Sequence, residues 1–198
     1  YVFIPDGLEQ GKIIGSAIYG PKTVAINGNY DDVNRLCSEI GDKYGWAFVN
    51  VNLRPYYSEG AKTHAFEIAE QLGWKLPQHI IVASAGGTIL PKLAKGLKEL
   101  IKVGLVEDTG CKIYSAQASG CAPIINALHK GTDLVSPVKP DTIASSIAIG
   151  NPADGYYVIQ AVRESGGWGE SVKDEEILEG IKLLARTDVV HVLATYAA

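Results

Sequence analysis

Strand-like apolar runs alternate with helix-periodic segments along the chain, and this alternation constrains the fold more than any other feature. Strands are predicted at residues 2–4, 23–26, 47–51, 80–83, 111–117 and 169–172. Strands separated by helices pair in parallel, because each crossover helix returns the chain to the same end of the sheet. The sequence therefore predicts an α/β fold with a parallel twisted sheet and crossover helices.

A turn of small residues joins one predicted strand to the helix that follows it. After residues 80–83 the chain reads Ser84-Ala-Gly-Gly-Thr88, and leucines then recur at helical spacing over residues 90–100. Thr88 is predicted to cap this helix. The unpaired N–H groups of such a turn, together with the helix dipole, form a site for an anion, usually a phosphate. A plain strand-to-helix turn with nothing bound is the alternative, and this segment leaves both open.

The composition excludes several classes of function. The net charge of −4 over 198 residues argues against nucleic acid or an anionic membrane as the main partner. The three cysteines are odd in number and lack CxxC spacing, and the four histidines are scattered, so no disulfide framework or metal site is expected. No apolar run approaches the length of a membrane span. These features fit a cytoplasmic protein.

Two further segments are candidates for lining a site. Arg54 follows the predicted strand at 47–51, within residues 52–60, which are predicted to form a loop. An arginine there could hold a phosphate or carboxylate by two parallel hydrogen bonds, or pair with an acid at the surface. Lys62 lies in Ser58-Glu-Gly-Ala-Lys-Thr63, which forms either a cavity wall or an ordinary helix N-terminus.

The chain divides in character near residue 50, where short strand–helix units give way to longer loops. We therefore predict two domains, residues 1–50 and 51–198. The chain contains no methionine and opens inside a predicted strand, so we expect it to be a fragment.

Several motifs resemble threonine synthase. Glu59-Gly-Ala-Lys-Thr-His-Ala-Phe-Glu67 is similar to the Glu-Gly-x-Lys-Thr-x-x-x-Glu segment of that family, and Ala85-Gly-Gly-Thr88 falls where its members carry a Gly-rich loop. Ile149-Gly-Asn-Pro152 looks like a signature of the same family, and residues 180–187 are also similar. The resemblance covers about residues 1–187. It implies the tryptophan synthase β-like fold of type II pyridoxal phosphate enzymes, here incomplete.

The resemblance also implies a function. The family converts O-phosphohomoserine and water to threonine and phosphate with pyridoxal phosphate as cofactor. Residues 1–50 would be the latter part of the small domain, and residues 51–198 a truncated large domain that binds the cofactor. The residues implied to hold the cofactor phosphate are Ala85, Gly86, Gly87 and Thr88, and the candidates for the substrate side are Arg54, Lys62 and Asn151.

The same resemblance implies what this chain lacks. The family forms a Schiff base through a lysine in a Ser-x-Lys-type motif, which is expected to lie outside this chain, so the chain alone is expected to be inactive. A homodimer is expected of the full-length enzyme. Two alternatives stay open: another type II enzyme, such as a threonine dehydratase or a cysteate or cysteine synthase, and a non-catalytic phosphate- or nucleotide-binding α/β module.

Overall fold

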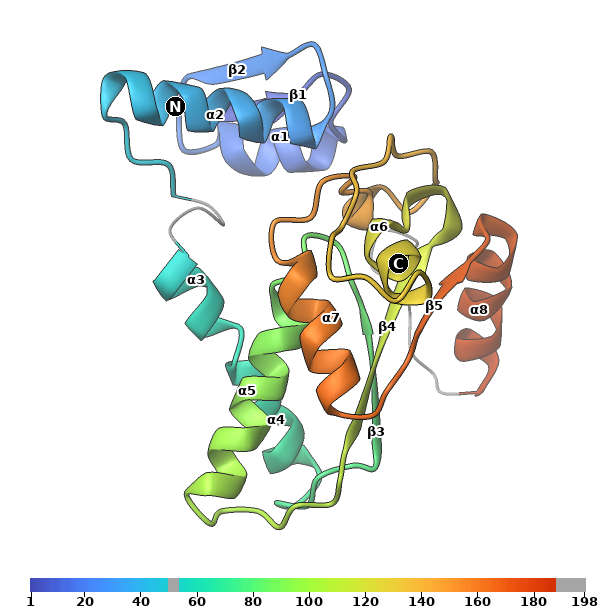
Figure 1. The fold of residues 1–198 in the computed structure, drawn as a ribbon. Coiled ribbons are helices and arrows are strands. Elements are labelled where there is room, and N and C mark those ends of the chain that lie inside the picture. The colour runs from blue at the N-terminus through green and yellow to red at the C-terminus, as the bar shows by residue number, and fades with distance from the viewer. Residues whose placement is uncertain (50–53, 188–198) are drawn as a thin grey trace. The chain divides into compact units, whose positions relative to one another are not determined.

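The computed structural model describes residues 1–49 and 54–187. The chain divides into two compact units with the boundary between residues 53 and 54. In each unit the strand pairs are parallel and helices connect them (Figure 1), so the predicted α/β class with parallel strands is confirmed. The assignment of residues 1–50 and 51–198 to a small and a large domain stays a prediction.

The first unit contains a two-stranded sheet and two helices. β1 (Val2–Pro5) pairs with β2 (Thr23–Ile26), and α1 (Gln10–Ala17) connects the two strands. α2 (Tyr30–Tyr44) begins with a capping box, in which Asn29 accepts from the Asp32 amide and Asp32 accepts from the Asn29 amide. Such reciprocal bonds satisfy two helix-end donors at once, which explains why the helix begins at this point.

The strand predicted at residues 47–51 is wrong for its described part. Residues 47–49 join neither sheet, and residues 50 and 51 lie outside the described part of the chain. The segment is instead attached through aromatic rings, because Phe48 packs edge-on against Phe3 with ring centroids 5.6 Å apart. Trp46 packs against Tyr1 at 5.1 Å. The apolar run that predicted a strand therefore reflects ring packing rather than backbone pairing.

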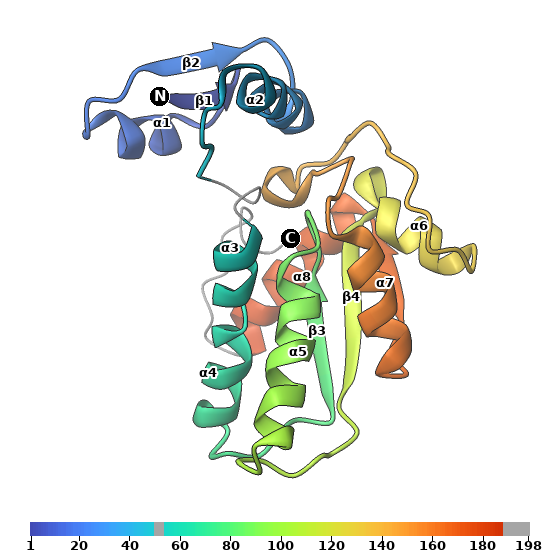
Figure 2. The same ribbon diagram turned by 60° about the vertical axis from the view of Figure 1, so that its left-hand side comes forward.

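The second unit is built on a three-stranded parallel sheet in the order β3-β4-β5 (Figure 2). The central strand is β4 (Lys112–Ala118), flanked by β3 (His79–Ala83) and β5 (Gly169–Val172). Its main core contains buried side chains from four helices: α4 (Thr63–Gln71), α5 (Ile89–Lys102), α6 (Pro123–His129) and α7 (Gly155–Glu164). A short 3-10 turn, η1 (Ser119–Cys121), links β4 to α6, and another, η2 (Ser145–Ile147), lies in the long loop before α7.

A smaller apolar cluster lies on the other side of this sheet. Ile177 of α8 (Asp174–Thr187) packs there with Ala118, Ala144 and Ile147. α8 covers the face opposite to α5 and α7 (Figures 1 and 2). The sheet is therefore covered by helices on both faces, as parallel sheets generally are.

The loop predicted at residues 52–60 is wrong from Arg54 onward, because residues 54–60 form the helix α3 (Arg54–Gly60). Residues 52 and 53 lie outside the described residues. Pro55 suggested a loop, yet it is the second residue of this helix, where a backbone N–H has no intrahelical acceptor.

No helix among the residues described is long and apolar enough to cross a bilayer.

Candidate functional site

The predicted strand–turn–helix is present, with residues 84–88 joining the carboxyl end of β3 to the amino end of α5. The Ser84 amide donates to the Ala116 carbonyl oxygen at 2.9 Å, so the ladder with β4 extends one residue beyond β3. Within the described part of the chain, the backbone N–H groups of residues 85–88 have no protein acceptor. Free amides at the start of a 14-residue helix are suited to an anion.

The two glycines of the turn have different environments. Gly87 has φ +91°, and a Cβ added there would lie 2.9 Å from Val158 Cγ2 and 3.0 Å from the Asp154 carbonyl carbon. A Cβ at Gly86 would meet only Ile149 Cδ1, at 3.6 Å. Gly87 therefore lets the turn pack tightly against α7. Gly86 is half-buried and presents bare backbone, which allows close approach of a phosphate-sized group.

Thr88 does not cap α5 as predicted. It occupies the N-cap position, but its side chain makes no capping bond to the α5 backbone. Its hydroxyl donates to Asp154 Oδ2 at 2.6 Å instead, because α7 brings this carboxylate to the turn. Of the four residues predicted to hold a phosphate, Thr88 therefore offers its amide, while its hydroxyl proton is directed to Asp154.

Buried polar side chains of β4 form hydrogen bonds to Ser84, the first residue of the turn. Ser115 donates to the Ser84 hydroxyl oxygen at 2.9 Å, and Gln117 Nε2 donates to the Ser84 carbonyl oxygen at 3.1 Å. Each of these three residues is at most 2% exposed. The sequence reasoning missed this network, and its only signal was the presence of polar residues in a strand otherwise expected to be apolar.

The segment that carries Asn151 lies beside the turn. Ile149 is the nearest neighbour of the open side of Gly86, and the Asp154 amide donates to the Gly86 carbonyl oxygen at 2.9 Å. Asn151 itself is exposed between these two contacts. The structure thus brings the Ile-Gly-Asn-Pro segment to the predicted phosphate site.

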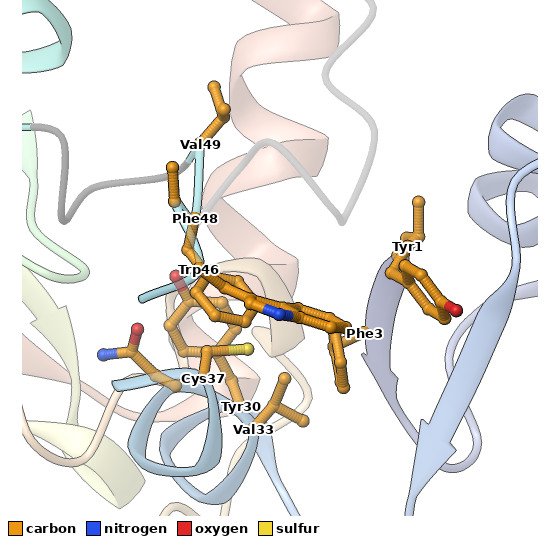
Figure 3. Close-up of a pocket in the computed structure, with 11 residues that line it drawn as sticks. Tyr1, Phe3, Tyr30, Val33, Cys37, Trp46, Phe48 and Val49 are labelled. Atoms are coloured by element: carbon orange, nitrogen blue, oxygen red, sulfur yellow. The ribbon is translucent and has the colours of Figure 1, made fainter. Parts of the chain in front are cut away.

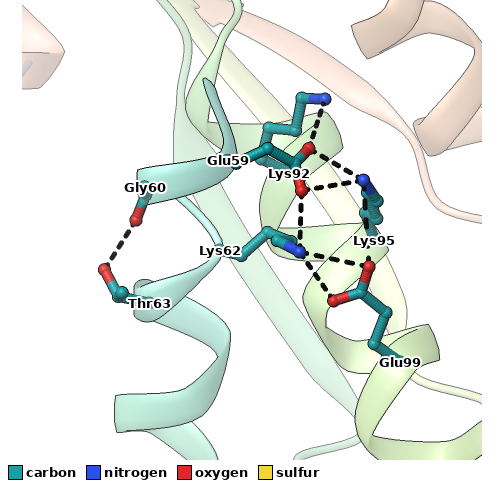
Figure 4. Close-up of polar contacts among 7 residues, drawn as sticks. All are labelled: Glu59, Gly60, Lys62, Thr63, Lys92, Lys95 and Glu99. Carbon is teal, nitrogen blue, oxygen red and sulfur yellow. Dashed lines mark hydrogen bonds and ion pairs between the residues drawn. The ribbon is translucent and has the colours of Figure 1, made fainter. Parts of the chain in front are cut away.

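Lys62 is engaged elsewhere, on the flank of α5 (Figure 4). Its ammonium lies 2.7 Å from Glu59 Oε2 and 2.9 Å from Glu99 Oε2. Hydrogen bonds to these carboxylates, Glu59 first, raise the pKa of Lys62, which is therefore a permanent cation at neutral pH. Its place in substrate binding stays a prediction, as does that of Arg54, whose side chain lies outside the described residues.

The same cluster contains further lysines. Glu59 also accepts from Lys92 at 3.1 Å and from Lys95 at 2.7 Å. Bonds to the lysines, that of Lys62 first, lower the pKa of Glu59 to about 2. Lys92, Lys95, Thr88 and Asp154 are among the residues lining an open pocket of about 330 Å³. At Thr88 the turn therefore borders open space.

A larger cavity, of about 650 Å³, lies within the first unit (Figure 3). Aromatic and aliphatic side chains dominate its lining, including Phe3, Tyr30, Trp46 and Phe48. Cys37 also lines it, and burial raises the pKa of this thiol, which keeps it protonated. Among the described residues that line it there is no carboxylate, lysine or histidine. In the described ranges 1–49 and 54–187, no group of three or more His, Cys, Asp or Glu side chains could hold a metal ion.

Known sequences resemble this chain over almost its whole length. The sequence model of the family described as "pyridoxal-phosphate dependent enzyme" matches residues 1–198. A protein named threonine synthase from Methanocaldococcus jannaschii is 36% identical over 193 residues, which cover 96% of this chain and 47% of that protein. A threonine synthase from Methanosarcina acetivorans is 37% identical over 199 residues, covering 100% of this chain and 49% of that protein. The chain thus spans about half the length of these relatives.

Solved structures show the same fold. An L-serine ammonia-lyase from the fungus Rhizomucor miehei superposes with a TM-score of 0.76 at 18% identity, covering 99% of this chain and 59% of that one. Maize serine racemase superposes with a TM-score of 0.72 at 18% identity, covering 98% and 55%. The predicted tryptophan synthase β-like fold, the resemblance to threonine synthase and the cofactor class are confirmed. This chain belongs to the family of pyridoxal-phosphate dependent enzymes.

Proposed function

We propose that this chain is the cofactor-phosphate-binding part of a threonine synthase. The complete enzyme then converts O-phosphohomoserine and water to threonine and phosphate, as a lyase of threonine biosynthesis in the cytoplasm. The observation that carries this proposal is the set of backbone N–H groups at residues 85–88, which have no protein acceptor in the described part of the chain. The two threonine synthases at 36% and 37% identity support the choice of reaction.

The residues of this chain contribute binding and orientation. The amides of Ala85, Gly86, Gly87 and Thr88 hold the phosphate of the cofactor, because they point from a helix start where negative charge is stabilised. Asn151, from the segment beside Gly86, contacts the substrate. Arg54 binds the phosphate or the carboxylate of the substrate through two parallel hydrogen bonds. Pyridoxal phosphate, when bound, supplies the electron sink for the elimination and addition steps.

The lysine that bonds covalently to the cofactor lies outside this chain in our proposal. The ion pairs of three lysines support this view. Lys92 and Lys95 both pair with the Glu59 carboxylate, which holds their ammonium groups on the flank of α5. A nucleophilic lysine needs a lowered pKa, whereas the bonds of Lys62 to Glu59 and Glu99 raise its pKa. The chain alone is therefore expected to be inactive.

Other type II reactions are the nearest alternative. The processed form of threonine deaminase isoform 2 from Solanum lycopersicum shares the fold, with a TM-score of 0.73 at 18% identity. That level of identity concerns the fold, whereas the threonine synthases match this chain at about twice the identity. The threonine synthase reaction is therefore preferred, and a homodimer is proposed for the complete enzyme.

A complementation assay tests the reaction. The chain is mixed, or fused, with the part of Methanocaldococcus jannaschii threonine synthase that it does not match, and O-phosphohomoserine, threonine or serine is added with pyridoxal phosphate. We expect threonine and phosphate from O-phosphohomoserine only when both parts are present. A 2-oxo acid released from threonine or serine, with no phosphate released from O-phosphohomoserine, would favour a deaminase. As the matched control, the unmatched part alone shows no turnover.

A further inference from the structure

We propose that Asp154 is the positioning residue of the cofactor-phosphate turn, holding Gly86, Gly87 and Thr88 in the conformation that leaves their amides open. The identity of the ligand in this inference rests on the proposed function. The contacts of Asp154 with the turn do not depend on that function. Neither the motifs of the sequence nor the comparisons assign a role to Asp154.

The N-cap residue of α7 contacts three consecutive residues of the turn. The Asp154 amide donates to the Gly86 carbonyl oxygen at 2.9 Å, and its carboxylate accepts from the Thr88 hydroxyl at 2.6 Å. Between these contacts, a Cβ added at Gly87 would lie 3.0 Å from the Asp154 carbonyl carbon, so the two backbones are in close contact. Asp154 and Thr88 are 66 positions apart, which means that the turn is fixed by a long-range pair rather than by its own sequence.

The two paired side chains forgo their usual local partners. Asp154 is the N-cap residue of α7 and Thr88 that of α5, yet neither side chain makes a capping bond to its own helix. Aspartate and threonine at N-caps normally accept hydrogen bonds from the first amides of their helix. Because Thr88 turns its hydroxyl to Asp154, no side chain in the described ranges accepts from the first amides of α5, and an incoming phosphate oxygen can take that place.

The charge of the carboxylate makes this pair strong. Asp154 is 8% exposed, and a hydroxyl bond to a charged carboxylate is stronger than the same bond between neutral groups. The contact also gives a role to the Ile149–Pro152 segment, which leads directly into Asp154 and packs against Gly86 through Ile149.

The negative charge of Asp154 is not itself favourable to a bound phosphate, and this separates a positioning role from an electrostatic one. Asn in place of Asp keeps an oxygen that accepts from Thr88 and removes the charge. The Asp154→Asn variant is therefore expected to bind pyridoxal phosphate at least as tightly as the parent chain. Asp154→Ala loses the acceptor and is expected to bind about 10-fold more weakly, the effect of one strong hydrogen bond.

The test compares the affinities of the chain for pyridoxal phosphate and for pyridoxal, which lacks the phosphate, by calorimetry. We expect Asp154→Ala, Thr88→Val and the double variant to lose affinity for pyridoxal phosphate by similar factors. Either single change already breaks the hydrogen bond between the two side chains, so combining them removes no further contact. Pyridoxal binding should not change. Asp174→Ala is the matched control, because Thr142 donates to Asp174 at 2.5 Å in a similar threonine–aspartate pair that includes neither Gly86, Gly87 nor Thr88.

A ligand-free measurement keeps this inference separate from the proposed function. In ¹H–¹⁵N spectra, the amide resonances of residues 86–88 should shift or broaden in Asp154→Ala, return in Asp154→Asn, and stay unchanged in Asp174→Ala. Unchanged resonances and unchanged affinity in a folded Asp154→Ala chain would overturn the positioning role. If the resonances respond but the parent chain binds pyridoxal phosphate no better than pyridoxal, the proposed function fails and the positioning of the turn stands.

Discussion

The side-chain amide of Gln117 donates a hydrogen bond of 3.1 Å to the carbonyl oxygen of Ser84, 33 residues earlier in the chain. Its other end accepts from the amides of Ile124 and Ile125 at 3.0 and 3.2 Å, so one side chain links the turn after β3 to the start of α6. Gln117 is 1% exposed. The Ser84 carbonyl oxygen and the amides of Ile124 and Ile125 therefore have a hydrogen-bond partner without water.

Replacing Gln117 with alanine is expected to destabilise the fold by about 3 kcal/mol, because it leaves buried donors and an acceptor unpaired. Urea unfolding followed by circular dichroism measures the change. Gln71→Ala is the matched control, since Gln71 is exposed and bonds only locally to Glu67, so its effect should stay within about 0.5 kcal/mol. Equal effects of the two changes would show that the network does not stabilise the turn.

The two glycines of the turn should respond differently to alanine. Gly87→Ala introduces a Cβ 2.9 Å from Val158 Cγ2 at a backbone φ of +91°, and about 2–4 kcal/mol of stability should be lost. Gly86→Ala meets its nearest neighbour at 3.6 Å and should cost less than about 1 kcal/mol. Thermal unfolding of both variants in the absence of cofactor measures this difference. A Gly86→Ala variant as unstable as Gly87→Ala would contradict the geometry.

The Glu59 cluster gives the chain a pH-dependent stability. The pKa of Glu59 is lowered from 4.5 to about 2, so the carboxylate stabilises the fold above pH 4.5, and this contribution is lost as pH falls toward 2. The difference in stability between the parent chain and Glu59→Gln should thus be constant above pH 5 and shrink between pH 4.5 and 2. Added salt should also reduce it, because the cluster is partly exposed.

Urea unfolding at a series of pH values measures this difference. The control is Glu164→Gln, which removes a single exposed ion pair to Lys98 and should change stability little at any pH. A parent–Glu59→Gln difference that does not change between pH 5 and 2 would contradict the bonds of Glu59 to its lysines.

The packing of α4 on α5 depends on Gly96. A Cβ there would lie 2.7 Å from the Ala65 Cβ and 3.1 Å from the Lys62 carbonyl oxygen. Gly96→Ala is expected to destabilise the fold by about 1–3 kcal/mol, because the helices must separate. Gly180→Ala in α8, where nothing lies within 4 Å of the added Cβ, should instead stabilise it by about 0.5–1 kcal/mol. Denaturant midpoints of both variants give the test, and a shift of the same sign would refute it.

Much of the fold could be predicted from local signals. The capping box at Asn29 fixed the start of α2, and the leucines at residues 90–100 identified α5 and the turn before it. α6 (Pro123–His129) also carries local cues, because a proline stands at its first position and an apolar run follows.

The predictions that failed depended on contacts distant in sequence. Residues 47–49 form no strand, and Phe48 instead packs its ring against that of Phe3 in β1. Thr88 has the residue type of a cap, but α7 supplies a buried carboxylate that takes its hydroxyl. No periodicity or spacing in the sequence places Asp154 or Gln117 at the turn, because both arrive through tertiary packing.

A titration of the ¹⁵N-labelled chain with pyridoxal phosphate, followed by ¹H–¹⁵N spectra, locates the phosphate site directly. We expect the amide resonances of residues 85–88 to move first and furthest. Inorganic phosphate at higher concentration should move the same resonances, and pyridoxal should not. Perturbations confined to the aromatic cavity of the first unit, or absent from residues 85–88 at saturating cofactor, would contradict it.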